Sequence, residues 1–219
     1  MLRSLALALA LLASGCVLSP DEAEYAGHVP RGAGLVTFSV SQPAIDTFDR
    51  LKTKILLGPA GVRTTDWRWS GNPFHWGEVA TEGRRNRSGL PGVNGQVFAL
   101  AIPAGDYEVL NFYFTQQPKS GAGGTVYSFK QDHPLPFRLR ENEVVYIGAF
   151  DLSVARKHNL IGIPYYAPGS FAIGDQSTRD LPELVRRFPD LRPDRIILRV
   201  VDGRSWVMTD DATDESRIR

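Results

Sequence analysis

Among the histidines and carboxylates of this sequence, the most plausible contributors to acid and base catalysis are His75, Glu78, Asp132 and His133. Histidine and carboxylate groups exchange protons with a substrate that lies within hydrogen-bond reach. Their position beside aromatic residues raises the hypothesis of a hydrolase whose site is assembled from distant parts of the chain. This stays the alternative reading, because the sequence has no Gly-x-Ser-x-Gly elbow, no Ser-x-x-Lys pair and no phosphate-binding glycine loop.

No metal or cofactor is predicted. None of the four histidines stands at a zinc-motif spacing, and the glycine between His75 and Glu78 argues against a helix that would align them. A group of aspartates could suggest calcium but lacks the dense alternation of a calcium loop, so helix capping and solvation explain it more simply. The group is Asp175, Asp180, Asp190 and Asp194. We expect no metal site, no catalytic residue and no enzymatic activity.

The single cysteine, Cys16, points to covalent modification instead. It follows Ser14-Gly15 and an apolar run from Leu5 to Leu12, which comes after the basic residue Arg3. This arrangement resembles the signal of bacterial lipoproteins. The resemblance implies export, a diacylglycerol thioether on Cys16, cleavage before that residue and acylation of the new terminus. The apolar run is too short for a membrane helix, which needs about 20 residues, so it is interpreted as a removed signal.

Lipidation also explains the odd cysteine count, because an unpaired thiol is a liability in an oxidising compartment. The acyl chains that the family carries bind a bilayer with roughly 0.8 kcal/mol for each buried methylene. Val17 is not the aspartate that retains lipoproteins at the inner membrane of enteric-type bacteria, so the resemblance favours the outer membrane, facing the periplasm. Residues 1–15 are then the signal peptide, and residues 16–33, rich in Pro, Gly and acidic residues, a lipidated flexible tether.

The charge balance excludes one class of partner. The sequence has 25 Lys and Arg and 24 Asp and Glu residues, and loss of Arg3 with the signal makes the two numbers equal. A formally neutral chain has no strong field to gather nucleic acid. The 21 glycines, 15 prolines and many aromatic residues favour turns and strands, so a mainly β fold is predicted.

The predicted strands follow from local alternation of apolar and polar residues. Gly34–Val40 alternates as a half-buried strand does, and Val144–Leu152 is apolar on both faces and therefore central. In the latter, Val145, Ile147 and Ala149 are expected on the face opposite Val144, Tyr146 and Phe150. The other predicted strands are Leu51–Leu57, Val97–Ile102, Tyr107–Phe114, Val126–Phe129, Ser170–Ile173 and Ile196–Val201. For the first of these a helix is the alternative, because Ile45, Phe48, Leu51 and Ile55 would share one helical face.

Turn and helix signals connect these strands. Pro103-Ala104-Gly105-Asp106 has turn chemistry, so the strands on either side are predicted to form a hairpin that buries Leu110, Phe112 and Phe114. One short helix is expected around Leu181–Phe188, capped by Asp180 and ended by Pro189. Residues 209–219 are charged and read as a disordered tail.

Part of this pattern carries a second resemblance. The pattern resembles that of small β-sandwich domains in bacterial envelope lipoproteins and of carboxypeptidase-regulatory or transthyretin-like modules. Its residues are Ile102-Pro103-Ala104-Gly105-Asp106-Tyr107-Glu108-Val109, then Phe137-Arg138-Leu139-Arg140 and Val144-Val145-Tyr146-Ile147-Gly148. Glu143 stands where many relatives have glycine, and the match covers residues 95–152. The resemblance implies an antiparallel β-sandwich, Ig/transthyretin-like, over residues 34–208 with one short C-terminal helix. Such modules are mostly noncatalytic.

Three aromatic or charged groups remain as surface candidates. Trp67, Trp69 and Trp76 either form a ligand platform or pack over one end of the sandwich. Tyr165 and Tyr166 either form an adhesive surface or pack at the edge of the core. The arginines of the 82–94 loop either bind an anion or are solvated.

The predicted function is that of a lipid-anchored, noncatalytic envelope protein. The membrane holds it through the N-terminal lipid, and loops of the sandwich bind an envelope protein or a cell-wall component. Anchoring raises the effective concentration of such a partner, so a modest interface suffices.

Overall fold

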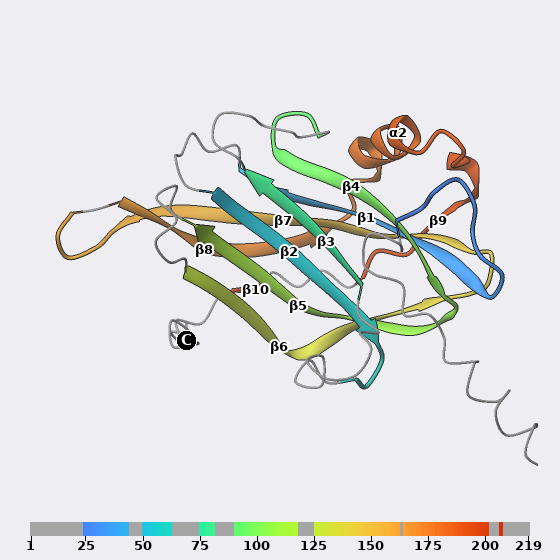
Figure 1. Ribbon diagram of the computed structural model, residues 1–219, viewed down its shortest axis with the longest axis horizontal. Coiled ribbons are helices and arrows are strands. Elements are labelled where there is room, and N and C mark those ends of the chain that lie inside the picture. The colour runs from blue at the N-terminus through green and yellow to red at the C-terminus, as the bar shows by residue number, and fades with distance from the viewer. Residues whose placement is uncertain are drawn as a thin grey trace, which may run out of the picture.

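The computed structural model describes residues 24–43, 50–62, 75–81, 90–117, 125–162, 164–201 and 206–207, with the backbone alone for 50, 75–81, 125–134, 164 and 206–207. Over these residues the fold is mainly β, with two sheets and one α-helix (Figure 1). The predicted lipidation site Cys16, the residues Trp67 and Trp69, the arginines at 84, 85 and 87 and the predicted tail lie outside the described residues.

The larger sheet has six strands in the order β10-β8-β7-β1-β4, with β9 also paired to β7. Its strands are β1 (Ala33–Gln42), β4 (Asn94–Pro103), β7 (Val144–His158), β8 (Pro164–Gly174), β9 (Ile196–Leu198) and β10 (Trp206–Val207). The pairs β1–β7 and β7–β9 are parallel, so the predicted all-antiparallel pairing is wrong. Parallel neighbours need long connections. Here the whole second sheet lies between β1 and β7 in the chain, and helix α2 (Ser177–Arg187) lies between β7 and β9.

The smaller sheet has four antiparallel strands in the order β3-β2-β5-β6. These are β2 (Arg50–Pro59), β3 (His75–Thr81), β5 (Gly105–Gln117) and β6 (Thr125–Leu139). The sequence pattern predicts β2 and one end of β6, at Val126–Phe129, but it misses β3 and the rest of β6. A short 3-10 helix, η3 (Pro193–Arg195), precedes β9.

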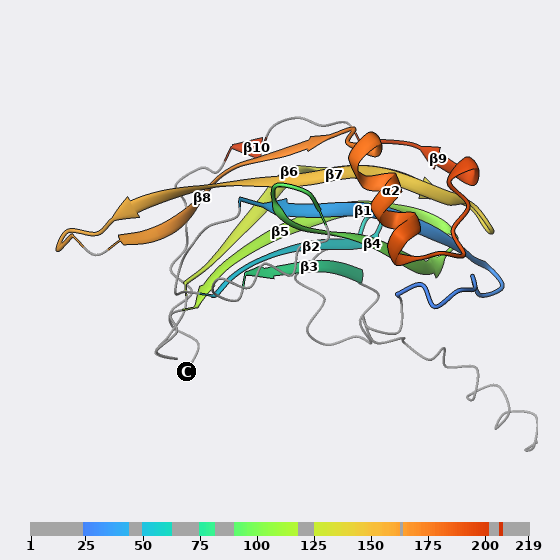
Figure 2. The same ribbon diagram turned by 90° about the horizontal axis from the view of Figure 1, so that it is seen from above.

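The elements form three layers, because α2 covers the outer face of the larger sheet and the smaller sheet covers its inner face (Figure 2). Phe112 of the smaller sheet packs between Phe150 and Phe171 of the larger one, with ring centroids 5.8 and 3.9 Å away. On the outer face, Leu35 and Tyr146 join Leu184 of α2 in a second core.

Strand β1 is buried on both faces over its whole length. The prediction that Gly34–Val40 is only half-buried is therefore wrong. Its larger apolar side chains, such as Phe38, face the other sheet. Its polar side chains, Thr37 and Ser39, are fully buried on the other face. The alternation is therefore real, but its polar face lies under the helix and not in water.

The predicted hairpin around Pro103–Asp106 is also wrong, because β4 belongs to the larger sheet and β5 to the smaller one. The turn instead carries the chain from one layer to the other. The Tyr107 hydroxyl donates to the Pro103 carbonyl at 2.8 Å, and the Tyr107 ring stacks on Phe137 at 5.7 Å. The motif that resembles envelope modules thus builds an inter-sheet crossing whose tyrosine fixes the bend.

Two β-bulges change which side chains reach the core. On β5 the register shifts between Val109 and Asn111, so Val109 is fully buried while Leu110 is only partly buried, in contrast to the prediction. On β7 the register against β1 shifts at Gly148, whose φ is +120°. Phe150 therefore lies in the inter-sheet core with Val145 and Ile147, and not opposite them. A bulge adds one residue and reverses the phase of the alternation.

The folded part begins before residue 34. Glu24 forms a bridge with Leu100 of β4, and the Tyr25 amide donates to the Ala99 carbonyl at 2.8 Å. The Tyr25 ring meets Phe188, after the end of α2, edge-on at 6.1 Å. Residues 24–33, predicted as part of the tether, thus lie against the larger sheet beside α2.

Candidate functional site

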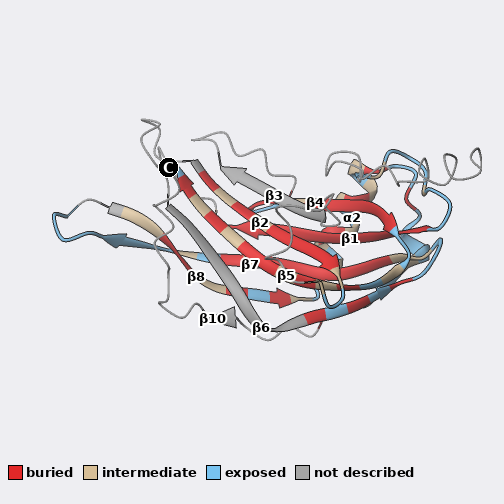
Figure 3. Ribbon diagram, turned by 60° about the horizontal axis from the view of Figure 1, so that its bottom comes forward, coloured by how far each residue is buried: buried red, intermediate tan, exposed pale blue. Residues whose placement is uncertain are grey.

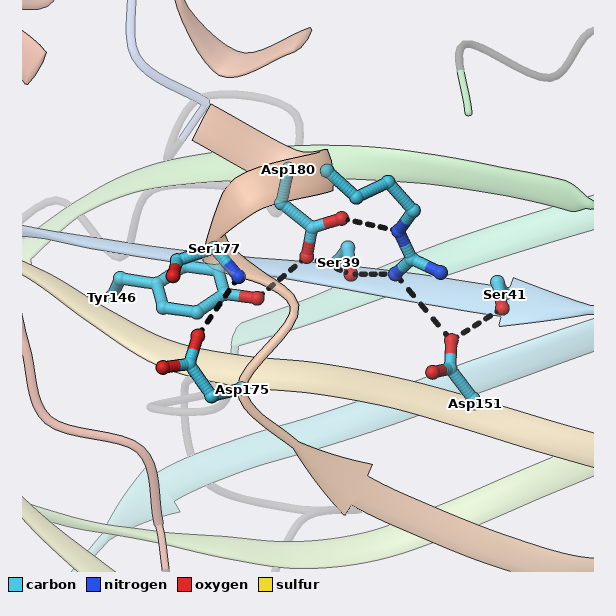
Figure 4. Close-up of polar contacts among 8 residues, drawn as sticks. Ser39, Ser41, Tyr146, Asp151, Asp175, Ser177 and Asp180 are labelled. Carbon is cyan, nitrogen blue, oxygen red and sulfur yellow. Dashed lines mark hydrogen bonds and ion pairs between the residues drawn. The ribbon is translucent and has the colours of Figure 1, made fainter. Parts of the chain in front are cut away.

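A buried group of polar side chains joins α2 to the larger sheet. We call it the latch: Ser39 and Ser41 of β1, Tyr146 and Asp151 of β7, and Arg179 and Asp180 of α2 (Figure 4). Asp180 is fully buried and lies at its centre. One carboxylate oxygen accepts from the hydroxyls of Ser39 and Tyr146, both at 2.6 Å, and the other pairs with Arg179 Nε at 2.7 Å.

Asp180 is not the helix cap that the sequence predicts. The helix begins at Ser177, and the Asp175 carboxylate accepts from the Ser177 amide at 2.8 Å, so the acceptor for this orphan amide comes from Asp175. The same contacts to Ser177 lower the pKa of Asp175. Asp180 lies one turn further on, where its side chain meets the sheet.

The outer part of the latch reaches solvent. Arg179 Nη2 donates to Ser39 Oγ at 3.1 Å and lies 3.5 Å from Asp151 Oδ1, which also accepts from Ser41 Oγ at 2.5 Å. Burial lowers the pKa of Arg179, but its bond to Asp180 and the charges of Asp180 and Asp151 outweigh this, and the net shift is upward. Burial, and then the Asp180 charge, raises the pKa of Tyr146 well above its usual value.

The latch fixes the helix and does not present a reactive group. A buried carboxylate is stable only when charged and hydrogen-bonding partners satisfy it, and Asp180 has three. Ser39 and Tyr146 are themselves fully buried. The hydroxyl protons point at the carboxylate and not at a cleft. We therefore assign the latch to stability, and look elsewhere for a binding surface.

The predicted acid and base residues are not brought together by the sheet order. His75 lies on β3 and His133 on β6, the two edge strands of the smaller sheet. Three strand spacings separate these edges, which corresponds to about 14 Å between backbones. Trp76 lies on β3 opposite Leu56, and the side chains of all three residues lie outside the described ones.

The most exposed apolar residues that the structure describes lie on the hairpin of β7 and β8. Both strands run beyond the rest of the sheet, and the hairpin projects from one end of the molecule (Figures 1 and 2). Leu160 is fully exposed and Ile161 is 79% exposed at its tip. Every residue from 155 to 162 is exposed (Figure 3). Further along β8, the Tyr166 amide donates to the Gln116 side chain of β5 at 3.0 Å.

Residues 159–162 of the tip form a hydrogen-bonded turn. The Gly162 amide donates to the Asn159 carbonyl at 3.0 Å, and the Ile161 amide donates to the Asn159 side chain at 3.1 Å. Gly162 has a φ of +81°, which glycine adopts without strain. Leu160 and Ile161 therefore occupy the two central positions of the turn, where side chains point away from the strands.

Sequence reasoning misses this hairpin, because it ends one strand at Leu152 and begins the next at Ser170. The signal was present in the turn residues Asn159 and Gly162 around two apolar residues. Of the two open readings for the tyrosine pair, each fits one member: Tyr166 is partly buried against the inter-sheet core, while Tyr165 lies further out, opposite Lys157.

Within the described ranges, no group of three or more His, Cys, Asp or Glu residues is arranged to hold a metal ion. Likewise, none of the helices described is both long and apolar enough to cross a bilayer. No protein-family model, no curated protein and no solved structure matches this chain.

Proposed function

We propose that the protein is a lipid-anchored, noncatalytic component of a bacterial cell envelope, held at the periplasmic side of the outer membrane through Cys16. In this proposal the β-sandwich is a rigid support, and the β7–β8 hairpin is the part that binds an envelope component. The observation that carries the proposal is the hairpin tip, where Leu160 and Ile161 are the most exposed large apolar residues that the structure describes. Exposed apolar groups gathered at one place mark interaction sites.

The architecture supports a binding role. The hairpin continues from strands that pair through the centre of the larger sheet, and the latch fixes α2 on that sheet. A binding element on a rigid sheet loses less conformational freedom on association than a loose loop does. We extend the proposal to the fold family, Ig/transthyretin-like, because the sequence motifs at 102–109, 137–140 and 144–148 resemble those modules. The parallel β1–β7 pair is a departure from a purely antiparallel sandwich.

Mass spectrometry of the protein purified from membranes tests the anchor. We expect an N-terminal peptide that begins at Cys16 and carries a diacylglycerol thioether and an amide-linked acyl chain. The variant Cys16→Ala is expected to lose both modifications and to keep its leader. A leader that remains intact on the wild-type protein, or a free thiol at Cys16 in cells that acylate lipoproteins, would contradict the proposal.

A co-purification experiment tests the binding role. Envelope material bound by the wild-type protein is compared with that bound by a variant in which Leu160 and Ile161 are both replaced by serine. We expect the bound component to be lost from this variant and retained by Asp194→Asn, which changes an exposed residue of η3. Equal recovery by all three proteins would contradict a role for the hairpin.

A further inference from the structure

We propose that the tip of the β7–β8 hairpin inserts into the surface of a bilayer that contains anionic phospholipid. This inference rests on the proposed function, because it names the partner of the hairpin. It is carried by the chemistry of the hairpin: an apolar tip, three basic residues before it on β7 and no acidic residue in the sequence from Leu152 to Gly174.

The apolar and charged residues are ordered along the hairpin in the way that a membrane interface requires. Leu160 and Ile161 form the tip, and Arg156, Lys157 and His158 precede them. Between Leu152 and Gly174 the sequence has no aspartate or glutamate, although the whole chain carries only one net positive charge. The hairpin is therefore a local concentration of positive charge on a nearly neutral protein. Basic residues beside an apolar segment are attracted to anionic headgroups.

The basic residues lie on both faces of the hairpin. Neighbours along a strand point to opposite faces, so Lys157 lies on one face, and Arg156 and His158 lie on the other. Lys157 is paired across the hairpin with Tyr165, and tyrosine is enriched at the level of lipid headgroups. A hairpin that lies in a protein groove needs one apolar face. One that enters a bilayer end-on needs polar anchors on every side, and this hairpin has them.

The spacing also fits a shallow insertion. Leu160 is three positions after Lys157 in the sequence, which corresponds to at most about 10 Å along the chain. Interfacial segments bury their apolar groups about 5–10 Å below the headgroup boundary. With Leu160 and Ile161 at that depth, Lys157 and Arg156 lie at the headgroups, where their long side chains reach phosphate groups.

The hairpin tip is far from the N-terminal segment. Residues 24–33 and the tip lie at opposite ends of the long axis of the molecule (Figure 1). The tip can therefore be tested on its own, in a chain that has no acyl group.

The experiment uses the full chain with Cys16→Ser and Ile161→Cys, so that the new thiol is the only one to which an environment-sensitive nitrobenzoxadiazole dye can be attached. The protein is mixed with vesicles of phosphatidylcholine and phosphatidylglycerol, or of phosphatidylcholine alone. We expect a blue shift of the dye emission that is strong with the anionic vesicles and weak with the neutral ones. A nitroxide attached just below the headgroups is expected to quench it.

A matched control carries the dye at Asp194→Cys in η3, an exposed position outside the hairpin, and no blue shift is expected there. This control separates insertion of the tip from binding of the leader to the vesicle. A second variant, Arg156→Glu with Lys157→Glu, is expected to bind the anionic vesicles at least about 30-fold more weakly. Arg156→Lys with Lys157→Arg is expected to retain the shift.

Absence of a shift at position 161 with both kinds of vesicle would overturn the inference. So would a shift that occurs only when an envelope protein fraction is added, because the partner is then a protein and the proposed binding role survives. Because this chain is not acylated, neither result depends on the modification of Cys16, which mass spectrometry tests separately.

Discussion

The latch and the hairpin tip are opposite departures from the usual arrangement of polar and apolar residues. The latch places charged and hydroxyl groups inside the protein, and Asp180 is satisfied there by Ser39, Tyr146 and Arg179. The tip places Leu160 and Ile161 outside, where their side chains are exposed to solvent. Internal contacts explain the first region completely. For the second we propose a partner, and on that proposal stability and binding are separated in this molecule.

Substitution of the central residue of the latch gives the largest expected effect. In Asp180→Ala the hydroxyls of Ser39 and Tyr146 and the Arg179 guanidinium lose their shared acceptor inside the protein. Removal of one partner from a buried ion pair costs about 3–5 kcal/mol. We expect the free energy of unfolding, measured in urea, to fall by that amount.

The matched control is Asp194→Asn, which removes an exposed carboxylate that lies 3.4 Å from Arg192. Exposed pairs contribute about 0–1 kcal/mol, so little change is expected. Equal stability of the Asp180 and Asp194 variants would mean that the latch does not hold the helix.

The bulge on β7 gives the next largest effect. Gly148 has a φ of +120°, and a Cβ atom there would lie 3.1 Å from Val200 Cγ1 and 3.2 Å from the Gly174 carbonyl. Strained backbone conformations cost about 1–3 kcal/mol. We expect Gly148→Ala to lower the midpoint of urea unfolding accordingly. The control Gly174→Ala adds a Cβ that meets no atom within 4 Å, and a loss of stability as large there would show that the bulge is not the cause.

The same bulge shows how far the sequence can predict this fold. Alternation of apolar and polar residues correctly identifies most of β1, β2 and β7, because that pattern is local. It fails beyond Gly148 and at Leu110, because one extra residue on a strand reverses the phase while the sequence stays unchanged. The prediction of Phe150 on the wrong face follows directly from this.

A local sequence pattern also does not show which strands pair or which residues a helix contacts. Pro103–Asp106 has the composition of a hairpin turn, but the same bend carries the chain between two sheets. Asp180 is of a residue type that often caps helices, but the helix begins three residues earlier. The hydroxyl partners of Asp180 come from the sheet. The β7–β8 hairpin has no such local pattern. Its strands extend past the core, so their residues do not alternate between apolar and polar, and alternation cannot identify them.

Alkaline unfolding separates the latch from the rest of the core with a smaller effect. The pKa of Tyr146 is raised in the folded protein, so its neutral form contributes stability below the unfolded pKa of about 10, and that stability is lost as the pH rises above it. At neutral pH we expect Tyr146→Phe to be less stable by about 1.5–3 kcal/mol, because a hydrogen bond to a carboxylate is lost.

Above pH 10 the wild-type protein should lose stability faster than the variant, by up to about 1.4 kcal/mol per pH unit. The measurement is urea unfolding of both proteins at a series of pH values from neutral to pH about 11. Parallel curves throughout would mean that Tyr146 ionises as readily in the folded protein as in the unfolded one.

The smallest effect on stability is expected at the hairpin tip, and it sharpens the comparison most. Exposed substitutions usually change the free energy of unfolding by less than about 0.5 kcal/mol, so a variant with Leu160→Asp and Ile161→Asp should unfold like the wild type. The same variant should bind anionic vesicles at least about 10-fold more weakly, because two apolar groups no longer enter the bilayer. Flotation of the vesicles with each protein measures the second quantity. A large loss of stability would show that the two residues pack against the protein, and the exposure on which the binding role rests would then be wrong.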